Sequence, residues 1–323
     1  MRIAAIILLI ASIGTQITPG QKTPRISVRR FKANPIITPK LSDTIGTNIN
    51  GPSLIRIPSW LPKPLGRYYL YFAHHNGQYI RLAFADQLEG PWKIHDPGVL
   101  PLDSLKGTGF SGHIASPDVH VDDDKRQIRM YFHSVHSSGG QKSSVAFSHD
   151  GIHFTCDGKA LGDFYFRVFK WQKSYYAIAK DLDIGGRLLR SSDGISPFEK
   201  CRDIIPRMRH AAVLLTDSTA FVFYSRGQDA PEHILISAFH LSGDCSSWTV
   251  TEPAEVLRPA EAYEGAALPI GPSDWGAIDK PANQLRDPAI YTENGRIFLV
   301  YAIAGESGLA VAELIILPGR VPG

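Results

Sequence analysis

The chain has 323 residues, of which 43% are hydrophobic and 20% charged, and its formal net charge is +3. This composition is ordinary for a soluble globular protein, and the small net charge without a long basic run argues against a nucleic-acid partner. The length allows one large domain or two.

The first residues have the pattern of a secretory signal peptide. Met1 and Arg2 precede an apolar run at residues 3–11, after which residues 12–21 turn polar. A membrane span needs about 20 apolar residues, so this run is too short for one. We expect residues 1–21 to be a signal peptide, an uncleaved anchor being the alternative, and the mature chain to be secreted or periplasmic without a membrane span.

Five similar units follow one another along residues 22–323. Each contains a strand that begins at a short polar motif, a tight turn, a second strand rich in tyrosine and phenylalanine, and a third strand. The first four units add a fourth strand with an aromatic residue, at residues 91–94, 153–155, 197–199 and 247–250. Four short strands per unit, repeated at intervals of roughly 45 to 75 residues, are typical of propeller blades. The sequence therefore predicts an all-β protein with one domain, a five-bladed β-propeller of four antiparallel strands per blade.

The fifth unit ends without a fourth strand, because the chain is nearly finished after Glu313. An N-terminal segment at residues 26–31 could pair beside residues 309–312 and close the ring. Closure of this kind removes exposed sheet edges. Within the fifth unit, Asn294 and Gly295 suit a hairpin turn that needs positive φ.

Three cysteines, Cys156, Cys201 and Cys245, lie at or beside the fourth strands of units two, three and four. These positions place them around the outer rim, too far apart for an easy disulfide. We therefore expect three unpaired thiols, and an odd number in an exported protein leaves at least one thiol free or paired between molecules in any case.

The first strand of each blade in a propeller lines a central channel, so side chains near its start face a funnel. In this chain those positions carry Asn50, Asp118, Arg167, His210 and the pair Arg286 and Asp287. Two carboxylates on different blades can cleave a glycosidic bond, one as general acid and the other as base or nucleophile.

The repeats, together with residues 34–36, 116–119 and 286–289, resemble the five-bladed glycoside hydrolases of family 43, the arabinanase and β-xylosidase type, and the related fructosidases. The resemblance covers nearly the whole mature chain. It implies a glycoside hydrolase acting on a plant or algal polysaccharide or an oligosaccharide derived from one.

The residues that the resemblance assigns to catalysis match only in part. The aspartate that orients the base corresponds to Asp118, but the base itself falls at Gly51 and the general acid at Arg167. Glu264 lies in a long segment before the fifth unit, and a loop of that length is more often functional than idle. We therefore predict Asp118, Asp287 and Glu264 as the catalytic set. The alternatives are a solvated loop carboxylate for Glu264 and a salt bridge from Asp287 to Arg286 or Arg167.

Histidines near the strand ends could bind sugar hydroxyls, act as general acid or hold a metal ion. His120 shares a strand face with Asp118, where it either orients that carboxylate or is a satisfied channel histidine. Glu306 follows a second strand, and we interpret it as a β-turn carboxylate in preference to a funnel residue. The predicted substrate-binding residues are Asn50, His74, His75, His120, Arg167, His210, Arg286 and Trp275.

No residue spacing is a strong metal signature, so the prediction includes no metal ion or other cofactor. The expected partner is a carbohydrate, and the oligomeric state stays open. Two other functions remain: a non-catalytic carbohydrate-binding propeller that has lost the usual base and acid, and, with less support, a metal-dependent lyase or hydrolase. The fold cannot separate them, because propellers have many unrelated functions.

Overall fold

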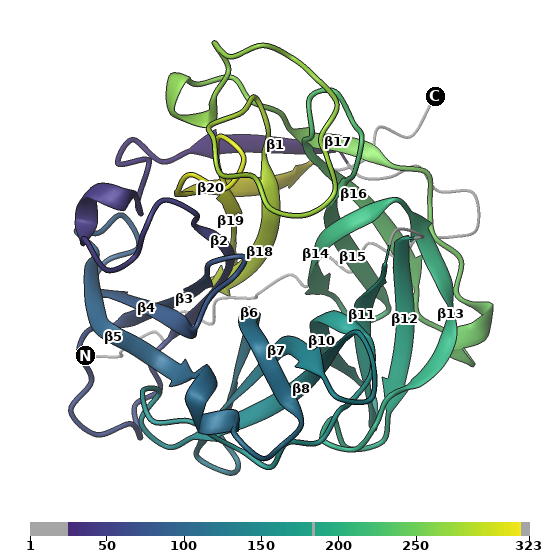
Figure 1. The fold of residues 1–323 in the computed structure, drawn as a ribbon. Helices are drawn as coiled ribbons and strands as arrows, with labels where there is room; N and C mark the ends of the chain where they lie inside the picture. The colour runs from purple at the N-terminus through teal and green to yellow at the C-terminus, as the bar shows by residue number, and fades with distance from the viewer. Residues whose placement is uncertain (1–24, 183–184, 318–323) are drawn as a thin grey trace, which may run out of the picture.

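The computed structural model describes residues 25–182 and 185–317, and within them five four-stranded antiparallel sheets are arranged around a central axis (Figure 1). The predicted five-bladed β-propeller is confirmed. The strands in chain order are β1 (Arg25–Arg30), β2 (Asn50–Arg56), β3 (Tyr68–Ala73), β4 (Tyr79–Ala85), β5 (Lys93–Pro101), β6 (Phe110–Asp122), β7 (Gln127–His136), β8 (Gln141–Ser148), β9 (Thr155–Cys156), β10 (Phe164–Trp171), β11 (Ser174–Asp181), β12 (Gly185–Ser191), β13 (Glu199–Pro206), β14 (Met208–Leu215), β15 (Thr219–Arg226), β16 (Ile234–His240), β17 (Ala254–Leu257), β18 (Arg286–Glu293), β19 (Arg296–Ala302) and β20 (Leu309–Leu317). The described helices are short 3-10 turns: η1 (Pro39–Leu41), η2 (Leu102–Leu105), η3 (Cys245–Ser247) and η4 (Ala262–Glu264).

Blades one to four take four consecutive strands each, in the orders β2-β3-β4-β5, β6-β7-β8-β9, β10-β11-β12-β13 and β14-β15-β16-β17. Their second strands are apolar because neighbouring blades cover both faces, and every residue of β3 is buried. Tyrosines of these strands also bond across the seams: Tyr71 donates to the carbonyl of Gly151, and Tyr131 to that of Gly194. The hydrophobic core therefore lies between the blades.

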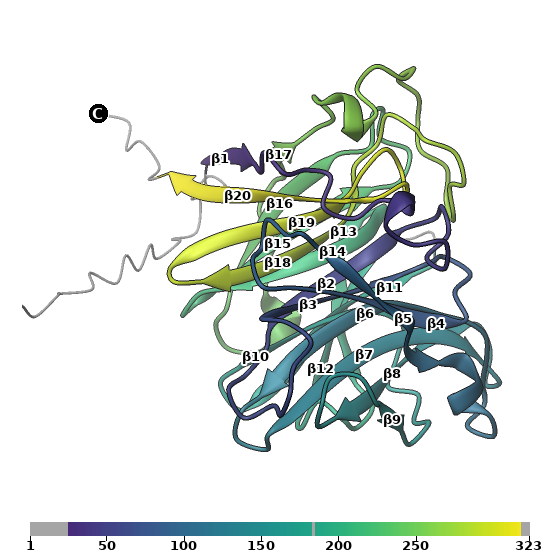
Figure 2. The same ribbon diagram turned by 90° about the vertical axis from the view of Figure 1, so that its left-hand side faces the viewer.

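Blade five is built from both ends of the chain, in the order β1-β20-β19-β18. Arg25 pairs with Leu317 and Arg30 with Ala312, so the N-terminal strand closes the ring as predicted (Figure 2). Glu313 of β20 joins this strand to its neighbours, because it contacts Arg29 of β1 and lies 2.7 Å from Nε of Arg296. The turn between β18 and β19 is formed by Asn294 and Gly295, both with positive φ.

The innermost strands β2, β6, β10, β14 and β18 each contain a bulge, where two residues oppose one on the neighbouring strand. Such a bulge bends the strand and turns a side chain toward a new direction. The bulge pairs are Gly51–Pro52, Ser116–Pro117, Tyr165–Phe166, Arg209–His210 and Asp287–Pro288. They occupy one structural position in the five blades and give the site its geometry.

Cys201 and Cys245 form a disulfide with a Cα–Cα distance of 5.6 Å, so the prediction of three unpaired thiols is wrong. Cys201 lies in β13, the outer strand of blade three, and Cys245 lies in η3 of blade four. The outer edges of adjacent blades approach each other at this point, which the linear spacing does not reveal. Cys156 is a free thiol.

The fourth strand of blade four also differs from the prediction. It is β17, Ala254–Leu257, whereas residues 245–247 form η3. Trp248 is buried beside Tyr176 of blade three, with ring centroids 4.7 Å apart, so its role is to pack the seam between the blades.

The predicted signal peptide, residues 1–21, lies outside the described residues. Among the helices that are described, none is long and apolar enough to cross a membrane.

Candidate functional site

The first residue of each bulge is buried near the propeller axis, and the five such residues are Gly51, Ser116, Tyr165, Arg209 and Asp287. Four of them have positive φ, between 47° and 69°. The register aligns Gly51 with Ser116 and Tyr165, whereas Asp118 and Arg167 align with Ser53. The expectation that Gly51, Asp118 and Arg167 occupy equivalent positions is therefore wrong, because the residues equivalent to Gly51 are Ser116 and Tyr165. In this ring the only carboxylate is that of Asp287.

Asp287 is completely buried, yet three groups bind its carboxylate. Nδ1 of His210 lies 2.5 Å from Oδ1, the hydroxyl of Tyr165 donates to Oδ1 at 3.3 Å, and the N–H of Gly51 donates to Oδ2 at 3.2 Å. Burial opposes ionisation, but His210, Gly51 and the charge of Arg286 together hold the pKa of the Asp287 carboxyl below its usual range. Neither arginine proposed from the sequence is its direct partner.

An aromatic row continues from His210 across the channel rim. The ring of Tyr165 lies 4.5 Å from that of His210 and 5.0 Å from that of His133, which in turn meets His113 at 5.6 Å. Burial lowers the pKa of His133 well below its usual value and also lowers that of His210. Burial therefore favours the neutral form of both imidazoles, and Nδ1 of His210 is the ring nitrogen that faces Asp287.

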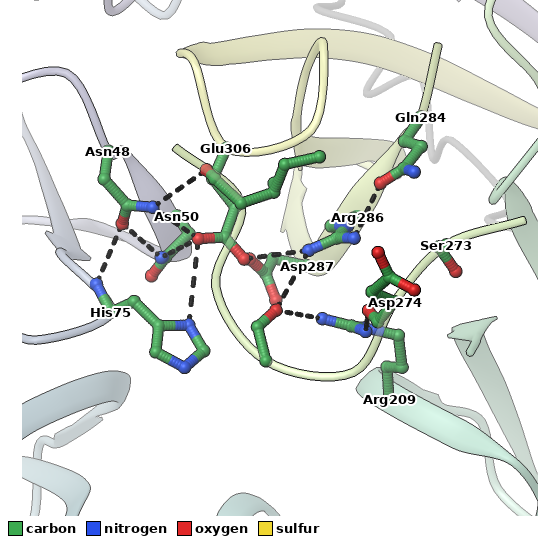
Figure 3. A network of polar contacts seen from close by, with 12 residues as sticks. Asn48, Asn50, His75, Arg209, Ser273, Asp274, Gln284, Arg286, Asp287 and Glu306 are labelled. Carbon is green, nitrogen blue, oxygen red and sulfur yellow. Dashed lines mark hydrogen bonds and ion pairs between the residues drawn. The ribbon is translucent and has the colours of Figure 1, made fainter. Parts of the chain in front are cut away.

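A second carboxylate, Glu306, lies in the turn between β19 and β20 and is also buried (Figure 3). Its Oε2 accepts bonds from Asn48 at 2.6 Å and Asn50 at 3.0 Å, and its Oε1 pairs with Arg286 at 3.1 Å. Nδ1 of His75 lies 3.7 Å from Oε2, and about a third of the His75 side chain is exposed, 32%. The interpretation of Glu306 as a simple turn carboxylate is therefore wrong.

Arg286 connects this group to a third buried acid, Glu232. Nε of Arg286 lies 3.1 Å from Glu232 Oε2, and Nε of Arg209 lies 3.3 Å from Oε1. Gln284 accepts from Nη2 of Arg286 at 2.6 Å. Two arginines and two glutamates thus form a compact array beside the rim, in which each charge is paired.

The long segment between β17 and β18 contacts this array. Backbone carbonyls of Asp274 and Gly276 accept from Arg209, and the carbonyl of Ile278 accepts from Asn48 at 3.2 Å. Trp275 is half-buried, with Lys180 4.7 Å from its ring centroid. The same indole packs so closely on Gly227 that a Cβ there would lie 2.6 Å from a ring carbon. Trp275 therefore belongs to the rim.

Asp118 and Arg167 join neighbouring blades near the propeller axis. Ser53 accepts the N–H of Val119 in blade two, and Asp118 accepts the equivalent N–H of Val168 in blade three at 2.7 Å. Asp118 also pairs with His120 at 2.9 Å. Burial opposes ionisation of Asp118, but His120 and Arg167 hold its pKa below the usual range. Both interpretations of His120 left open by the sequence agree with this contact.

Glu264 does not reach the other predicted acids. Its carboxylate binds Nε of Arg30 in β1 at 2.8 Å, the hydroxyl of Tyr301 at 2.7 Å, and the N–H groups of Ala260 and Glu261. All these groups belong to blade five and to the segment that leads to it. This carboxylate anchors the closing strand, and the sequence-based placement of Glu264 in the funnel is not what the structure shows.

The structure thus brings together Asn50, His75, His210, Arg286, Asp287 and Trp275 from the predicted residues. His74 lies beside them, where its Nδ1 accepts the N–H of Asn76 at 3.0 Å. The sequence gives no indication of Glu232, which follows Pro231 in a loop without any motif. For Glu306 the sequence favoured a simple turn carboxylate, whereas the structure buries it in the polar network. Within the described residues, no group of three or more His, Cys, Asp or Glu side chains has the arrangement of a metal site.

No family model matches this chain. The uncharacterized protein R118 of Acanthamoeba polyphaga mimivirus is 33% identical to it over 345 aligned positions, which cover 95% of this chain and 96% of the viral protein. The chain belongs to the family of this mimivirus protein.

Solved structures with the same fold include several glycoside hydrolases. A putative glycoside hydrolase from Bacteroides ovatus superposes with a TM-score of 0.62 at 13% identity, covering 89% of this chain and 96% of that one. A thermostable family-43 glycoside hydrolase gives 0.61 at 13%, covering 86% and 93%. An α-L-arabinanase from Cellvibrio cellulosa gives 0.55 at 11%, covering 82% and 91%. The protein therefore has the fold of the family-43 glycoside hydrolases, and identities this low concern the fold alone.

Proposed function

We propose that this chain is an exported glycoside hydrolase that acts on a plant or algal polysaccharide, or an oligosaccharide derived from one, at the mouth of the central channel. The observation that carries the proposal is a pair of imidazole–carboxylate contacts. His75 of blade one pairs with Glu306, and His210 of blade four pairs with Asp287. Both carboxylates belong to blade five, and the charge of Asp287 acts on Glu306, so the two pairs lie close to each other.

Glycoside hydrolysis needs one group that protonates the leaving oxygen and a second that activates water or attacks. His75 is the more exposed member of its pair, so a substrate can reach it, and in this proposal it donates the proton while Glu306 orients its ring. His210 is the complementary group, because burial lowers its pKa and keeps it neutral. With Nδ1–H directed to Asp287, its Nε2 can accept a proton from water.

Two features support export. The N-terminal residues have the charge and the apolar run of a signal peptide. The disulfide between Cys201 and Cys245 is of a kind that persists in oxidising compartments and is rare in the cytosol.

A carbohydrate-binding propeller without catalysis is the second candidate. It is favoured by the burial of Asp287 and Glu306 and by the lack of acidic residues at Gly51, Ser116 and Tyr165. In that case the exposed imidazole and the half-buried indole of Trp275 would contact sugar hydroxyls and ring faces without bond cleavage.

The test is turnover of aryl glycosides and of arabinan- and galactan-type oligosaccharides by the purified mature chain. His75→Gln and Asp287→Asn should each lower kcat by about 100-fold or more, the usual contribution of a general acid or base. His149→Gln, which replaces an exposed histidine of the β8–β9 turn, is the matched control and should be neutral. Binding without turnover in the wild type would select the second candidate, and neither binding nor turnover would overturn both.

A further inference from the structure

A hollow of about 370 Å³ lies between blades two and three, where residues of β6, β7, β10, β11 and the β6–β7 turn line it. This volume is within the range of small-molecule sites. The bulge of β6, at Ser116 and Pro117, adjoins Gly51, whose N–H binds Asp287. Six residues of strand separate Ser116 from Asp122 at the hollow, which spans roughly 20 Å. The hollow is therefore distinct from the site proposed above.

One part of the wall is apolar and aromatic. Val168 and Phe169 line the hollow and are otherwise buried, and Tyr175 is half-buried. Two cations lie against the Tyr175 ring, Cζ of Arg129 at 5.4 Å and Nζ of Lys170 at 5.5 Å from its centroid. These contacts hold the ring in place. A fixed aromatic ring beside aliphatic side chains is a surface that the carbon skeleton of a ligand covers better than water does.

Polar groups surround this apolar part. His120 lines the hollow with 39% of its side chain exposed, and its Nε2 binds Asp118 at 2.9 Å, which leaves Nδ1 for a ligand. Arg129 is 4% exposed and pairs through Nη2 with Asp122 at 3.3 Å. Its Nε has no hydrogen-bond partner among the described residues. A buried donor of this kind in a native protein normally binds water or a ligand.

The charges around the hollow oppose one another. Three carboxylates and three cationic side chains line it: Asp122, Asp123, Asp124, Lys125, Arg129 and Lys170. The carboxylates repel an anion and the cationic groups repel a cation, so the walls favour a neutral ligand. That ligand must both donate to carboxylates and accept from nitrogen donors, which hydroxyl groups do.

We infer that this hollow is a second carbohydrate-binding site, which takes a neutral sugar unit of a glycan chain. A sugar ring has an apolar face that can cover Tyr175, and its hydroxyl groups can bond to His120, Lys170 and the aspartates. The site binds without cleaving, and it needs no hydrolysis elsewhere in the molecule. A glycan held here would keep the protein attached to the polymer whether or not the first site cleaves it.

The direct test is a crystal form that leaves the hollow open, soaked with xylotriose, arabinotriose or galactotriose. The inference requires density for a sugar ring in contact with Tyr175 and His120. Sugar at the channel mouth alone, or water alone in the hollow with all three probes, would overturn it.

Calorimetric titration tests the chemical class of the ligand in solution. A neutral trisaccharide from the same set should bind at least about 10-fold more tightly than trigalacturonic acid or the trimer of glucosamine, because each charged probe meets like charges in the wall. Tighter binding of either charged trimer would contradict the neutral class.

Two variants assign the binding to the hollow. Val121→Trp fills the space and should abolish this binding, and Lys170→Ala removes an exposed donor and should weaken it about 10-fold. Lys173→Ala is the matched control, because it removes an exposed lysine of the same β10–β11 hairpin from outside the hollow. Unchanged affinity in Lys170→Ala and in folded Val121→Trp would overturn the inference.

The Lys170 variant decides the question by itself if Val121→Trp does not fold. Turnover of aryl glycosides is measured separately, so failure of the hollow to bind sugar and failure of the proposed hydrolysis are distinguishable.

Discussion

Nδ1 of His210 lies 2.5 Å from Oδ1 of Asp287 and joins the innermost strands of blades four and five at the channel rim. Both side chains are buried, and no arginine replaces the histidine as the direct partner of this carboxylate. The contact therefore holds an ionised aspartate against a neutral imidazole, with the N–H of Gly51 and the hydroxyl of Tyr165 completing its coordination. The buried carboxylate of Glu264 differs, because its partner is the charged guanidinium of Arg30.

The first prediction contrasts these two carboxylates. Asp287→Asn should lower activity by about 100-fold per folded molecule. The neutral amide lacks the negative charge with which the carboxylate orients His210 for proton transfer. Its stability should fall by about 1–3 kcal/mol through lost bonds to buried donors. Glu264→Gln should destabilise by roughly 2 kcal/mol, less than the loss for a fully buried pair, since the Arg30 side chain keeps 22% exposure.

Turnover corrected for the folded fraction, together with urea unfolding, measures both effects. Glu264→Gln should retain wild-type activity once that correction is made. Asp287 would lose its proposed role if the activity lost in Asp287→Asn equalled the unfolded fraction.

The second prediction concerns Gly51. Its φ is +56°, and a Cβ at this position would lie 3.2 Å from Cα of Ser116. Gly51→Ala should therefore destabilise the protein by about 1–3 kcal/mol through left-handed strain and crowding. The same crowding means that an aspartate could not simply be restored here.

The matched comparison is Ala289→Gly, which removes a methyl group from an innermost strand where the bulge has already ended. Urea unfolding of both variants gives the two free-energy changes. Equal stability of Gly51→Ala and the wild type would show that the backbone of Ser116 moves aside.

The third prediction is a loss of stability in mild acid. Burial lowers the pKa of His133 in the folded state, so between its folded pKa and about 6.5 the unfolded chain binds one more proton than the native one. Stability should be complete above pH 6.5 and fall as the pH decreases, by up to about 1.4 kcal/mol per pH unit for this group. His210 acts in the same direction.

His133→Phe, which suits the aromatic neighbours Phe164 and Tyr165, should flatten this dependence. Unfolding free energies between pH 5 and 7.5 measure the slope, and this window avoids the titration of carboxylates. An unchanged slope in the variant would assign the acid sensitivity to other groups.

The fourth prediction concerns the disulfide. Cys201 and Cys245 are separated by 44 residues, and closing a loop of that size stabilises a protein by up to about 4 kcal/mol in the chain-entropy model. Cys201→Ser with Cys245→Ser should lower the Tm and make it insensitive to dithiothreitol. Cys156→Ser, the control, should keep both the Tm and the effect of reductant; a wild-type Tm unaffected by reductant would contradict the prediction.

The sequence was sufficient for the architecture because each blade is locally encoded. Aromatic second strands, turns such as Asn294–Gly295 and the missing fourth strand after Glu313 together predict five blades closed by residues 26–31. The disulfide was missed because it depends on how two neighbouring blades meet, and no distance along the chain reports that.

The site was less accessible to sequence reasoning. Glu306 lies in a turn, where a carboxylate is usually exposed. It is buried here because Asn48, Asn50 and Arg286 bind it, and these residues come from other segments of the chain. Asp118 was placed at the rim because the bulge shifts the alignment by two residues. The sequence does contain a signal for the correct alignment. A proline follows the first bulge residue in three blades, at Gly51–Pro52, Ser116–Pro117 and Asp287–Pro288, and these pairs are structurally equivalent.

The pairing of Arg25 with Leu317 places the two ends of the described chain side by side on blade five. A short linker between them would make this blade one continuous segment, and new termini opened in the connection between β5 and β6 would yield a circular permutant. In that molecule no sheet would be shared between the ends of the chain. Only the packing of one blade on the next would then keep the ring shut.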